Sequence, residues 1–385
     1  MISIACEIAR HNFNDVTLSR VPMLRTVLIT TALVSCIQPD EPELGSTEQL
    51  GVCPIGMCGG NSPLLGPHKA EELNEKGVEN SAKIKLLGYI KAGSTCSTSR
   101  PCKVDVVGRQ MFVRDIYGGT FTGSTLAGGY LSVWQPGDSN FAPPLPAGNA
   151  RIWLDSYSTN AKFWQSPYEP LESYGLSYEV PGITRGPLCL SPPNVVDNEG
   201  NPWLSRFEAF FFTGDRYDHD KMTVTASTMA EAGDWFNIAC AGSATAKLLL
   251  NRHTTAGALG SSLNPTRAQR QTMLKMYTGD FCGTGTTYTV QGTKISWGKV
   301  GGGLAGPSVT GINSVESFWT ENGAICMDRH RLASSQNTAE AALEGMVRNG
   351  YLASPPTCRQ MPKCSELPTS TLTGTYLWTA SAALP

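Results

Sequence analysis

The stretch "VDVVGRQMFVRDIY" (residues 104–117) alternates short runs of strand-forming residues with turn residues. Four more runs of this kind lie around it: "IKLLGYIKA" (84–92), "GGYLSVW" (128–134), "ARIWLDSYS" (150–158) and "LSYEV" (176–180). Such runs, rich in β-branched and aromatic residues and separated by Gly, Asn and Pro, are typical of antiparallel sheets. We therefore expect a sandwich or a barrel-like arrangement in this part of the chain.

One of these runs carries large side chains on both of its faces. Ile152 and Leu154 alternate with Arg151, Trp153 and Asp155 along "ARIWLDSYS". Bulk on both faces is typical of a strand that other elements cover on both sides. We expect this strand to be covered in that way.

Helix signals begin further along the chain. Ser243 is the expected N-cap of a first helix, and a second is expected between Pro265, at its first position, and Gly279. A third is expected from Asn337 to Gly350. The segment "SFWTENGAICM" (317–327) predicts a hairpin that turns at Asn322-Gly323. The expected fold class is α+β and strand-rich: an antiparallel sheet or barrel-like region, followed by strands with about three helices and stapled by disulfides.

The segment "RFEAFFFTGDRYDHDKMTVTAS" (206–227) predicts a strand, a turn and a second strand. Its aromatic run, Phe207 and 210–212, fits a buried strand better than a platform on which bases or sugars would stack. The acidic residues of the turn lack the Gly and the distal Glu of a calcium loop, so we expect a solvated turn at Asp215, Asp218, His219 and Asp220.

Composition narrows the function classes. The 385 residues carry a formal net charge of -2, so there is no excess of Lys and Arg to neutralise nucleic-acid phosphates. The Gly run "GKVGGGLAG" is followed by Pro307 in place of Lys-Ser/Thr, so we expect a loop there and no cradle for a phosphate. We expect no nucleic-acid partner and no cofactor.

The segment "MLRTVLITTALVSC" starts at Met23 and has the design of a signal peptide. Its apolar run, 27–34, is far shorter than the ~20 residues that span a bilayer. The ending "LVSC" resembles the lipobox of bacterial lipoproteins, which implies lipid attachment at Cys36, and Ile37 after it implies sorting to the outer membrane. The alternatives are an ordinary signal peptide with an incidental Cys, or cleavage after Ala32.

These features suggest an order of segments along the chain. We expect a leader that is not translated (1–22), a lipoprotein signal peptide (23–35), a flexible tether (36–82), a strand-rich part (84–190), a second domain (190–365) and a C-terminal tail (366–385). Acyl chains at Cys36 would hold the protein on a membrane without spanning it.

Twelve cysteines are present, and ten remain without Cys6 and Cys36. An even number in an oxidising compartment predicts a disulfide framework. Close spacing favours three pairs: Cys53–Cys58, Cys96–Cys102 and Cys358–Cys364. The other four, Cys189, Cys240, Cys282 and Cys326, allow three connectivities. We favour Cys282–Cys326, because both lie on strand-like segments that lead from or into hairpin turns, which leaves Cys189–Cys240. Zinc is the alternative at Cys53 and Cys58, but no second pair of ligands follows at a suitable spacing, and no metal is expected.

The stretch "GDFCGTGTTYTVQGTKI" (279–295) resembles the hallmark of the ADYC domain, in which Asp280, Phe281, Cys282 and Gly283 take the place of the motif's last three residues and the glycine after them. Fragments around Cys189, Cys240 and Cys326 fit the same family, and the resemblance covers roughly 105–365. Two cysteines of the family pattern are replaced here by Leu248 and Met273, as the loss of one disulfide would require. The resemblance implies a lipoprotein of Gram-negative bacteria, and the family has no assigned reaction.

Two classes of function remain for comparison. The first is a lipid-anchored, non-enzymatic module that binds an envelope protein or a glycan, or serves as a structural component. The second is an envelope hydrolase with Cys282 or a Ser as nucleophile and His253 or His330 as base. No G-x-S-x-G or H-E-x-x-H motif occurs in the sequence. We therefore favour the binding module and name no catalytic residue.

Overall fold

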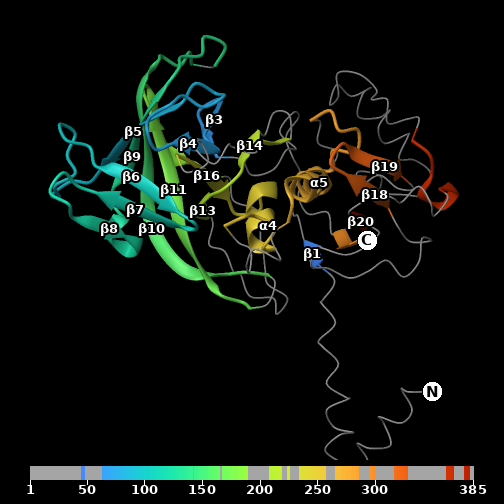
Figure 1. Ribbon diagram of the computed structural model, residues 1–385. Coiled ribbons are helices and arrows are strands. Elements are labelled where there is room, and N and C mark those ends of the chain that lie inside the picture. Colours follow the sequence, from blue (N-terminus) through green and yellow to red (C-terminus); the bar gives the residue numbers. More distant parts are fainter. Residues whose placement is uncertain are drawn as a thin grey trace, which may run out of the picture. The chain divides into compact units, whose positions relative to one another are not determined.

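The computed structural model describes the ranges 45–47, 63–141, 143–164, 167–189, 208–218, 223–225, 234–256, 265–285, 295–299, 316–327, 361–367 and 377–381. All of them belong to one unit, Leu44–Pro385 (Figure 1). Within these ranges no helix is long and apolar enough to cross a membrane.

An eight-stranded antiparallel sheet forms the largest element. Its path is β4 (Glu72–Asn74), β16 (Trp235–Cys240), β13 (Glu208–Thr213), β11 (Pro170–Val180), β10 (Gly148–Lys162), β9 (Tyr130–Gln135) and β5 (Lys85–Ile90), and β12 (Ile183–Pro187) pairs with β11. The long strands β10 and β11 dominate it in Figure 1, in green. The predicted antiparallel sheet is confirmed, but the path is open, so the sheet is no closed barrel.

A three-stranded sheet covers one face of the large sheet. It consists of β6 (Lys103–Val107), β7 (Gln110–Arg114) and β8 (Thr120–Thr122), followed by the short 3-10 helix η1 (Gly123–Leu126). Val104 and Val113 of the small sheet lie in the same buried cluster as Leu131, Ile152 and Leu176 of the large one. Alternation along the strands produces this shared core, because every second side chain points to it.

The opposite face of β10 is exposed, which corrects one expectation. Arg151 and Asp155 are exposed and Trp153 is half-buried, whereas Ile152 and Leu154 are buried. The strand is therefore covered on one side only. The large side chains of the other side contact one another in place of a covering element, as described below.

Two α-helices are present in the described ranges, fewer than the three expected. Helix α4 (Ala244–Leu250) has the predicted N-cap, since the Ser243 hydroxyl accepts a hydrogen bond from the Ala246 amide. Helix α5 (Arg267–Thr278) ends at Gly279 as predicted, with φ +66°. Its N-cap is Thr266, so Pro265 precedes the helix instead of opening it. The expected helix 337–350 lies outside the described residues.

A five-stranded sheet and a second buried cluster accompany the helices. The sheet has the order β1 (Gly45–Thr47), β17 (Ile295–Lys299), β20 (Leu377–Ser381), β18 (Ser317–Thr320) and β19 (Gly323–Met327). The β18–β19 hairpin is confirmed, but Thr320 pairs with Gly323, so the turn is Glu321-Asn322. The remaining elements are β2 (Leu64–Leu65), β3 (His68–Lys69), β14 (Arg216–Asp218), β15 (Thr223–Thr225) and the short 3-10 helix η4 (Cys364–Glu366).

The structure changes three of the expected segment boundaries. Strand β4 pairs with β16, and Leu65 and Leu73 are buried, so the tether does not extend to residue 82. The large sheet takes strands from both sides of residue 190, which is therefore no domain boundary. Strand β20 pairs with β17 and β18 within the expected C-terminal tail. The leader, the signal peptide and Cys36 lie outside the described residues.

Candidate functional site

A groove of about 540 Å³ crosses the solvent-facing side of β5, β9, β10 and β11. Arg151 lies opposite Ser132 on one neighbouring strand and opposite Glu179 on the other, which places the three side chains on the same face. The loop that carries Thr98 and the β11–β12 turn at Gly182 complete its lining. The groove is therefore formed by sheet residues between two connecting loops.

The lining combines aliphatic and polar side chains. Its aliphatic members include Leu87, Ile90, Pro101 and Ile183. Its polar members include Asn149, Arg151, Glu179 and Thr184. Such a surface removes apolar area of a ligand from water and also supplies hydrogen-bond donors and acceptors that orient it.

Aromatic and arginine side chains form a row along one edge of this groove. The rings of Tyr130 and Trp153 lie 4.7 Å apart between centroids. The Arg151 guanidinium lies 5.2 Å from the Tyr130 ring and 3.1 Å from the Glu179 carboxylate, and Arg185 lies 4.3 Å above Trp153. Trp153 Nε1 also donates to Glu179 at 3.2 Å. Each side chain is held by at least one other, so the edge of the groove is ordered before any ligand binds.

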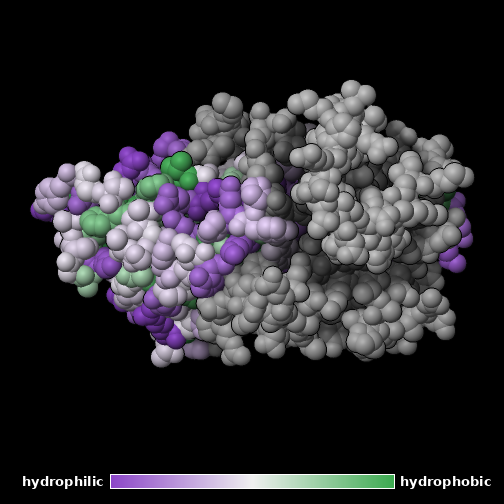
Figure 2. All heavy atoms as spheres, turned by 90° about the horizontal axis from the view of Figure 1, so that it is seen from below, coloured by the Kyte–Doolittle hydropathy of each residue, from purple (hydrophilic) through white to green (hydrophobic). Residues whose placement is uncertain are grey.

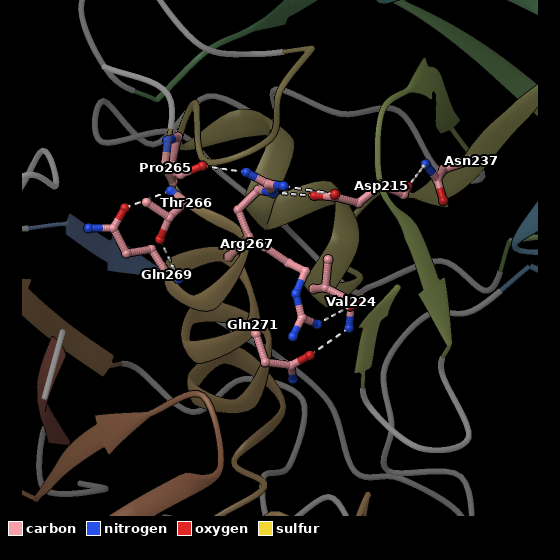
Figure 3. A network of polar contacts seen from close by, with 9 residues as sticks. Asp215, Val224, Asn237, Pro265, Thr266, Arg267, Gln269 and Gln271 are labelled. Atoms are coloured by element: carbon pink, nitrogen blue, oxygen red, sulfur yellow. Dashed lines mark hydrogen bonds and ion pairs between the residues drawn. The ribbon is translucent and has the colours of Figure 1, made fainter. Parts of the chain in front are cut away.

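The polar network in Figure 3 fixes the start of α5. Arg270 is paired with the Asp215 carboxylate, with Nη2 2.8 Å from Oδ1, and both side chains are buried. The Gln271 side chain accepts from the Val224 amide at 2.6 Å, and Arg267 donates to the Val224 carbonyl at 3.0 Å. These contacts attach the helix to the β14–β15 hairpin. Asp215, expected in a solvated turn, is thus an internal partner of the helix.

Asp280, directly after α5, is fully buried and has several partners. Lys275 Nζ donates to its Oδ2 at 2.5 Å, and the amides of Thr284 and Gly285 donate to its carboxylate at 3.0 and 2.9 Å. The side chains of the ion pair are 0% and 3% exposed. The carboxylate therefore closes the loop that follows the helix, and solvent does not reach it.

The next residues join this loop to the β18–β19 hairpin. The Phe281 ring lies 4.8 Å from Trp319, and its carbonyl accepts from the Ala324 amide at 2.9 Å. Gly283 has φ +68°, and a Cβ there would lie 2.0 Å from the Asn322 carbonyl oxygen. Only glycine fits a positive φ at such a close approach of two backbones. Asp280, Phe281 and Gly283 thus have structural roles.

The model of the ADYC domain family matches residues 123–333. The chain belongs to the ADYC domain family. The matched span begins at η1 and includes the strands β9–β11 of the groove, the β12 strand and the motif after α5. No curated protein and no solved structure compared with the chain matches it.

The cysteines of this ADYC-family chain agree with the predicted framework only in part. Cys96–Cys102 and Cys189–Cys240 are bonded as predicted. Cys326 is bonded to Cys364, so the predicted pairs Cys282–Cys326 and Cys358–Cys364 are wrong. Spacing favoured a close partner for Cys364, whereas the fold places Cys326, 38 residues away, within bonding distance.

Cys282 is disulfide-bonded, as predicted. Its predicted partner was wrong, and Cys53, Cys58 and Cys358 lie outside the described residues. Leu248 and Met273 are both fully buried in one apolar cluster. Both positions are therefore part of the apolar core around the two helices.

The structure describes two of the residues named for the hydrolase alternative, Cys282 and His253. Neither has the properties of a catalytic group. Because Cys282 is bonded, it has no thiol that could ionise to a nucleophile. His253 is fully buried 5.0 Å from the Trp297 ring, and burial lowers its pKa to about 3. A histidine that stays neutral and shielded does not exchange protons with a substrate. His330 lies outside the described residues, and within them no group of three or more His, Cys, Asp or Glu could hold a metal ion.

Sequence reasoning did not identify the groove, because its residues come from five strands and two loops. The alternation of Arg151, Trp153 and Asp155 was the available signal. It pointed to bulk on both faces, but it did not distinguish a covered face from a row of contacting side chains in solvent. The aromatic run of β13, in contrast, is buried as predicted at Phe210–Phe212.

Proposed function

We propose that this ADYC protein is a non-enzymatic binding module, held at the outer membrane by lipid on Cys36, and that its groove receives a segment of another envelope protein. The "LVSC" pattern after a short apolar run supports the anchor. The three disulfides among the described residues support an oxidising compartment, where such bonds persist.

The groove is the observation that carries the proposed binding role. Aliphatic side chains such as Leu87 and Ile183 lie beside the polar residues Asn149, Arg151 and Glu179. A protein interface has the same anatomy, with an apolar centre and a polar, hydrated rim. Arg151 and Glu179 neutralise each other at 3.1 Å, which favours a ligand without a strong net charge. An uncharged stretch of polypeptide meets both conditions.

A non-enzymatic role is supported by the chemistry of the motif. The polar groups of the motif that could act on a substrate are already engaged: Asp280 with Lys275 and two amides, and Cys282 in a disulfide. They are committed to holding the fold together.

Photo-crosslinking tests the groove. We expect a benzoylphenylalanine at Leu87, which is exposed in the groove, to form a discrete adduct in cells that produce the protein, and the same residue at Val78, exposed outside it, to form none. Proteolysis should reduce the mass of the adduct, and adding Arg151→Glu should abolish it. No adduct at Leu87, equal adducts at both positions, or a protease-resistant glycan adduct would each contradict the proposal.

Mass spectrometry of the N-terminal peptide tests the anchor. The proposal requires an N-terminal Cys36 with acyl chains in protein extracted from membranes. A peptide that continues through an unmodified Cys36 from an earlier residue would refute lipid anchoring, and the groove experiment would still stand.

A further inference from the structure

The turn between β7 and β8 presents two large apolar side chains to solvent. Ile116 is 61% exposed and Tyr117 is 72% exposed. Among the described residues, the other exposed large apolar side chains, such as Val78 and Val107, do not occur as adjacent pairs. Figure 2 shows a largely hydrophilic surface where the described residues are visible, with small hydrophobic patches. An adjacent exposed pair at a turn is therefore unusual for this surface.

Hydrogen bonds within the turn hold this pair in place. The Asp115 carboxylate accepts from the amides of Tyr117 and Gly119 at 2.9 and 2.6 Å. The Thr95 hydroxyl donates to the same carboxylate at 2.8 Å and, with these amides, holds the pKa of Asp115 below its usual range. Little conformational freedom of the turn remains to be lost on binding.

The loop beside the turn is also fixed. The Cys96–Cys102 disulfide closes it, Thr95 binds Asp115, and Arg100 Nη1 donates to the Tyr117 hydroxyl at 3.3 Å. An arginine is thereby placed next to the exposed tyrosine. We call Ile116, Tyr117 and Arg100 the tip patch.

The charge around the tip patch differs from that of the whole chain. Residues 91–122, which form the stapled loop and the three-stranded sheet, contain five basic residues, Lys91, Arg100, Lys103, Arg109 and Arg114, and two acidic ones, Asp105 and Asp115. The chain as a whole has a net charge of -2. The basic residues form no run in the sequence. Arg100, Lys103 and Arg114 lie at the tip end of the small sheet and its loop, whereas Arg109 lies at the other end and is paired with Glu169. This part of the molecule is electrostatically complementary to an anionic surface.

We propose that the tip patch docks on the surface of an anionic phospholipid bilayer. Tyrosine is favoured where one end of a side chain is apolar and the other hydrated, as at the headgroup level of a bilayer, and Ile116 would enter the acyl boundary beside it. Arg100 can place its charge at the phosphates while its stem covers apolar surface. Two side chains at a turn tip are too small an area for a stable protein interface, which buries about 800 Å² on each partner. This contact is separate from the groove and requires no acyl chain.

Vesicle cosedimentation tests the proposal with the full chain carrying Cys36→Ser, so that no lipid at that position contributes. We expect binding to vesicles of phosphatidylcholine with phosphatidylglycerol, weaker binding at high salt, and little binding to phosphatidylcholine alone. Ile116→Ser with Tyr117→Ser should weaken binding at least tenfold. The matched control Val107→Ser removes an apolar side chain that is 63% exposed at the other end of the β6–β7 hairpin, and should leave binding unchanged.

A further variant separates the ring from its hydroxyl. Tyr117→Phe keeps the apolar ring and loses only the contact with Arg100, so it should retain most of the binding. Unchanged circular dichroism of each variant would show that the fold is intact. The proposal is overturned if the chain does not bind anionic vesicles, or if the double substitution and Val107→Ser reduce binding equally.

Discussion

The groove face of the large sheet and the motif region after α5 use charged residues in opposite ways. On the groove face, Arg151 and Glu179 are 46% and 39% exposed and lie in the lining of a groove. In the motif region, Lys275 and Asp280 are 3% and 0% exposed and bond to each other and to the backbone. The hallmark of the family therefore marks a structural junction, and the groove lies on strands of the large sheet.

The difference has an energetic consequence. An exposed ion pair contributes about 0 to 1 kcal/mol to stability, because water solvates both partners well in its absence. Removing one member of a buried pair costs about 3 to 5 kcal/mol, because the other charge stays in a medium that solvates it poorly. Substitutions in the motif region should therefore act on folding, and those on the groove face should act on binding with little effect on folding.

The largest expected effect is that of Asp280→Ala. It removes the carboxylate that faces the buried Lys275 ammonium and accepts from two amides, so we expect a loss of about 3 to 5 kcal/mol in the free energy of unfolding. Urea denaturation of the oxidised protein measures it. Lys76→Ala is the matched control, because it breaks an equally short pair with Asp234 at 2.6 Å that is 66% and 25% exposed. A control loss as large as that of Asp280→Ala would show that burial does not set the difference.

A smaller effect is expected for Gly283→Ala. This glycine has φ +68°, and a Cβ would lie 2.0 Å from the Asn322 carbonyl oxygen, so the hairpin β18–β19 would have to move away. We expect a loss of about 2 to 3 kcal/mol from strain and displacement together. Gly118→Ala separates the two causes, because that glycine has φ +85° with open space around it and should lose only about 1 kcal/mol. Thermal unfolding of both variants gives the comparison. Equal losses of stability would mean that the β18–β19 hairpin moves away from residue 283 without an energetic cost.

Local signals in the sequence predicted the elements whose stability depends on local chemistry. The end of α5 was predictable because Gly279 provides the left-handed C-cap, and the α4 N-cap because Ser243 accepts from Ala246. The observed start of α5 differs from the predicted start at Pro265. Thr266 and Gln269 form a capping box, so the helix begins at Arg267. Signals of this kind lie within a few residues of the feature that they predict.

The remaining features depend on contacts between distant residues. Polar residues such as Glu72 and Asn74 led us to expect a solvated tether over residues 36–82. The Glu72 carboxylate, however, accepts a hydrogen bond from Arg216, 144 residues away, at 2.6 Å. Cys326 of β19 is bonded to Cys364 of η4, and beside this bond the Met327 amide donates to the Pro362 carbonyl at 3.0 Å. The groove likewise requires the register of β9, β10 and β11, which aligns Ser132, Arg151 and Glu179. No pattern within one segment contains this information.

The smallest expected effect concerns Glu75, which directly follows strand β4 of the large sheet. Burial is the main reason that the pKa of Glu75 is raised from 4.5 to about 7, and Asp105 adds to the rise, although the Val106 amide donates to its carboxyl. The folded chain thus binds this proton more tightly than the unfolded chain. Stability from this group is complete below about pH 4.5 and is lost as the pH rises to about 7.

Glu75→Gln removes that dependence and keeps an oxygen that can accept from the Val106 amide. We expect the variant to be more stable than the parent at pH 8 and nearly equal at pH 4.5. Because the side chain is only about half buried, solvent screening limits the gain to less than about 1 kcal/mol. Urea midpoints at the two pH values measure it, and Glu79→Gln, exposed four residues further on, should shift neither. If Glu75→Gln changed the midpoint equally at both pH values, its effect would come from altered packing, and the carboxyl would not be a source of pH dependence in the sheet region.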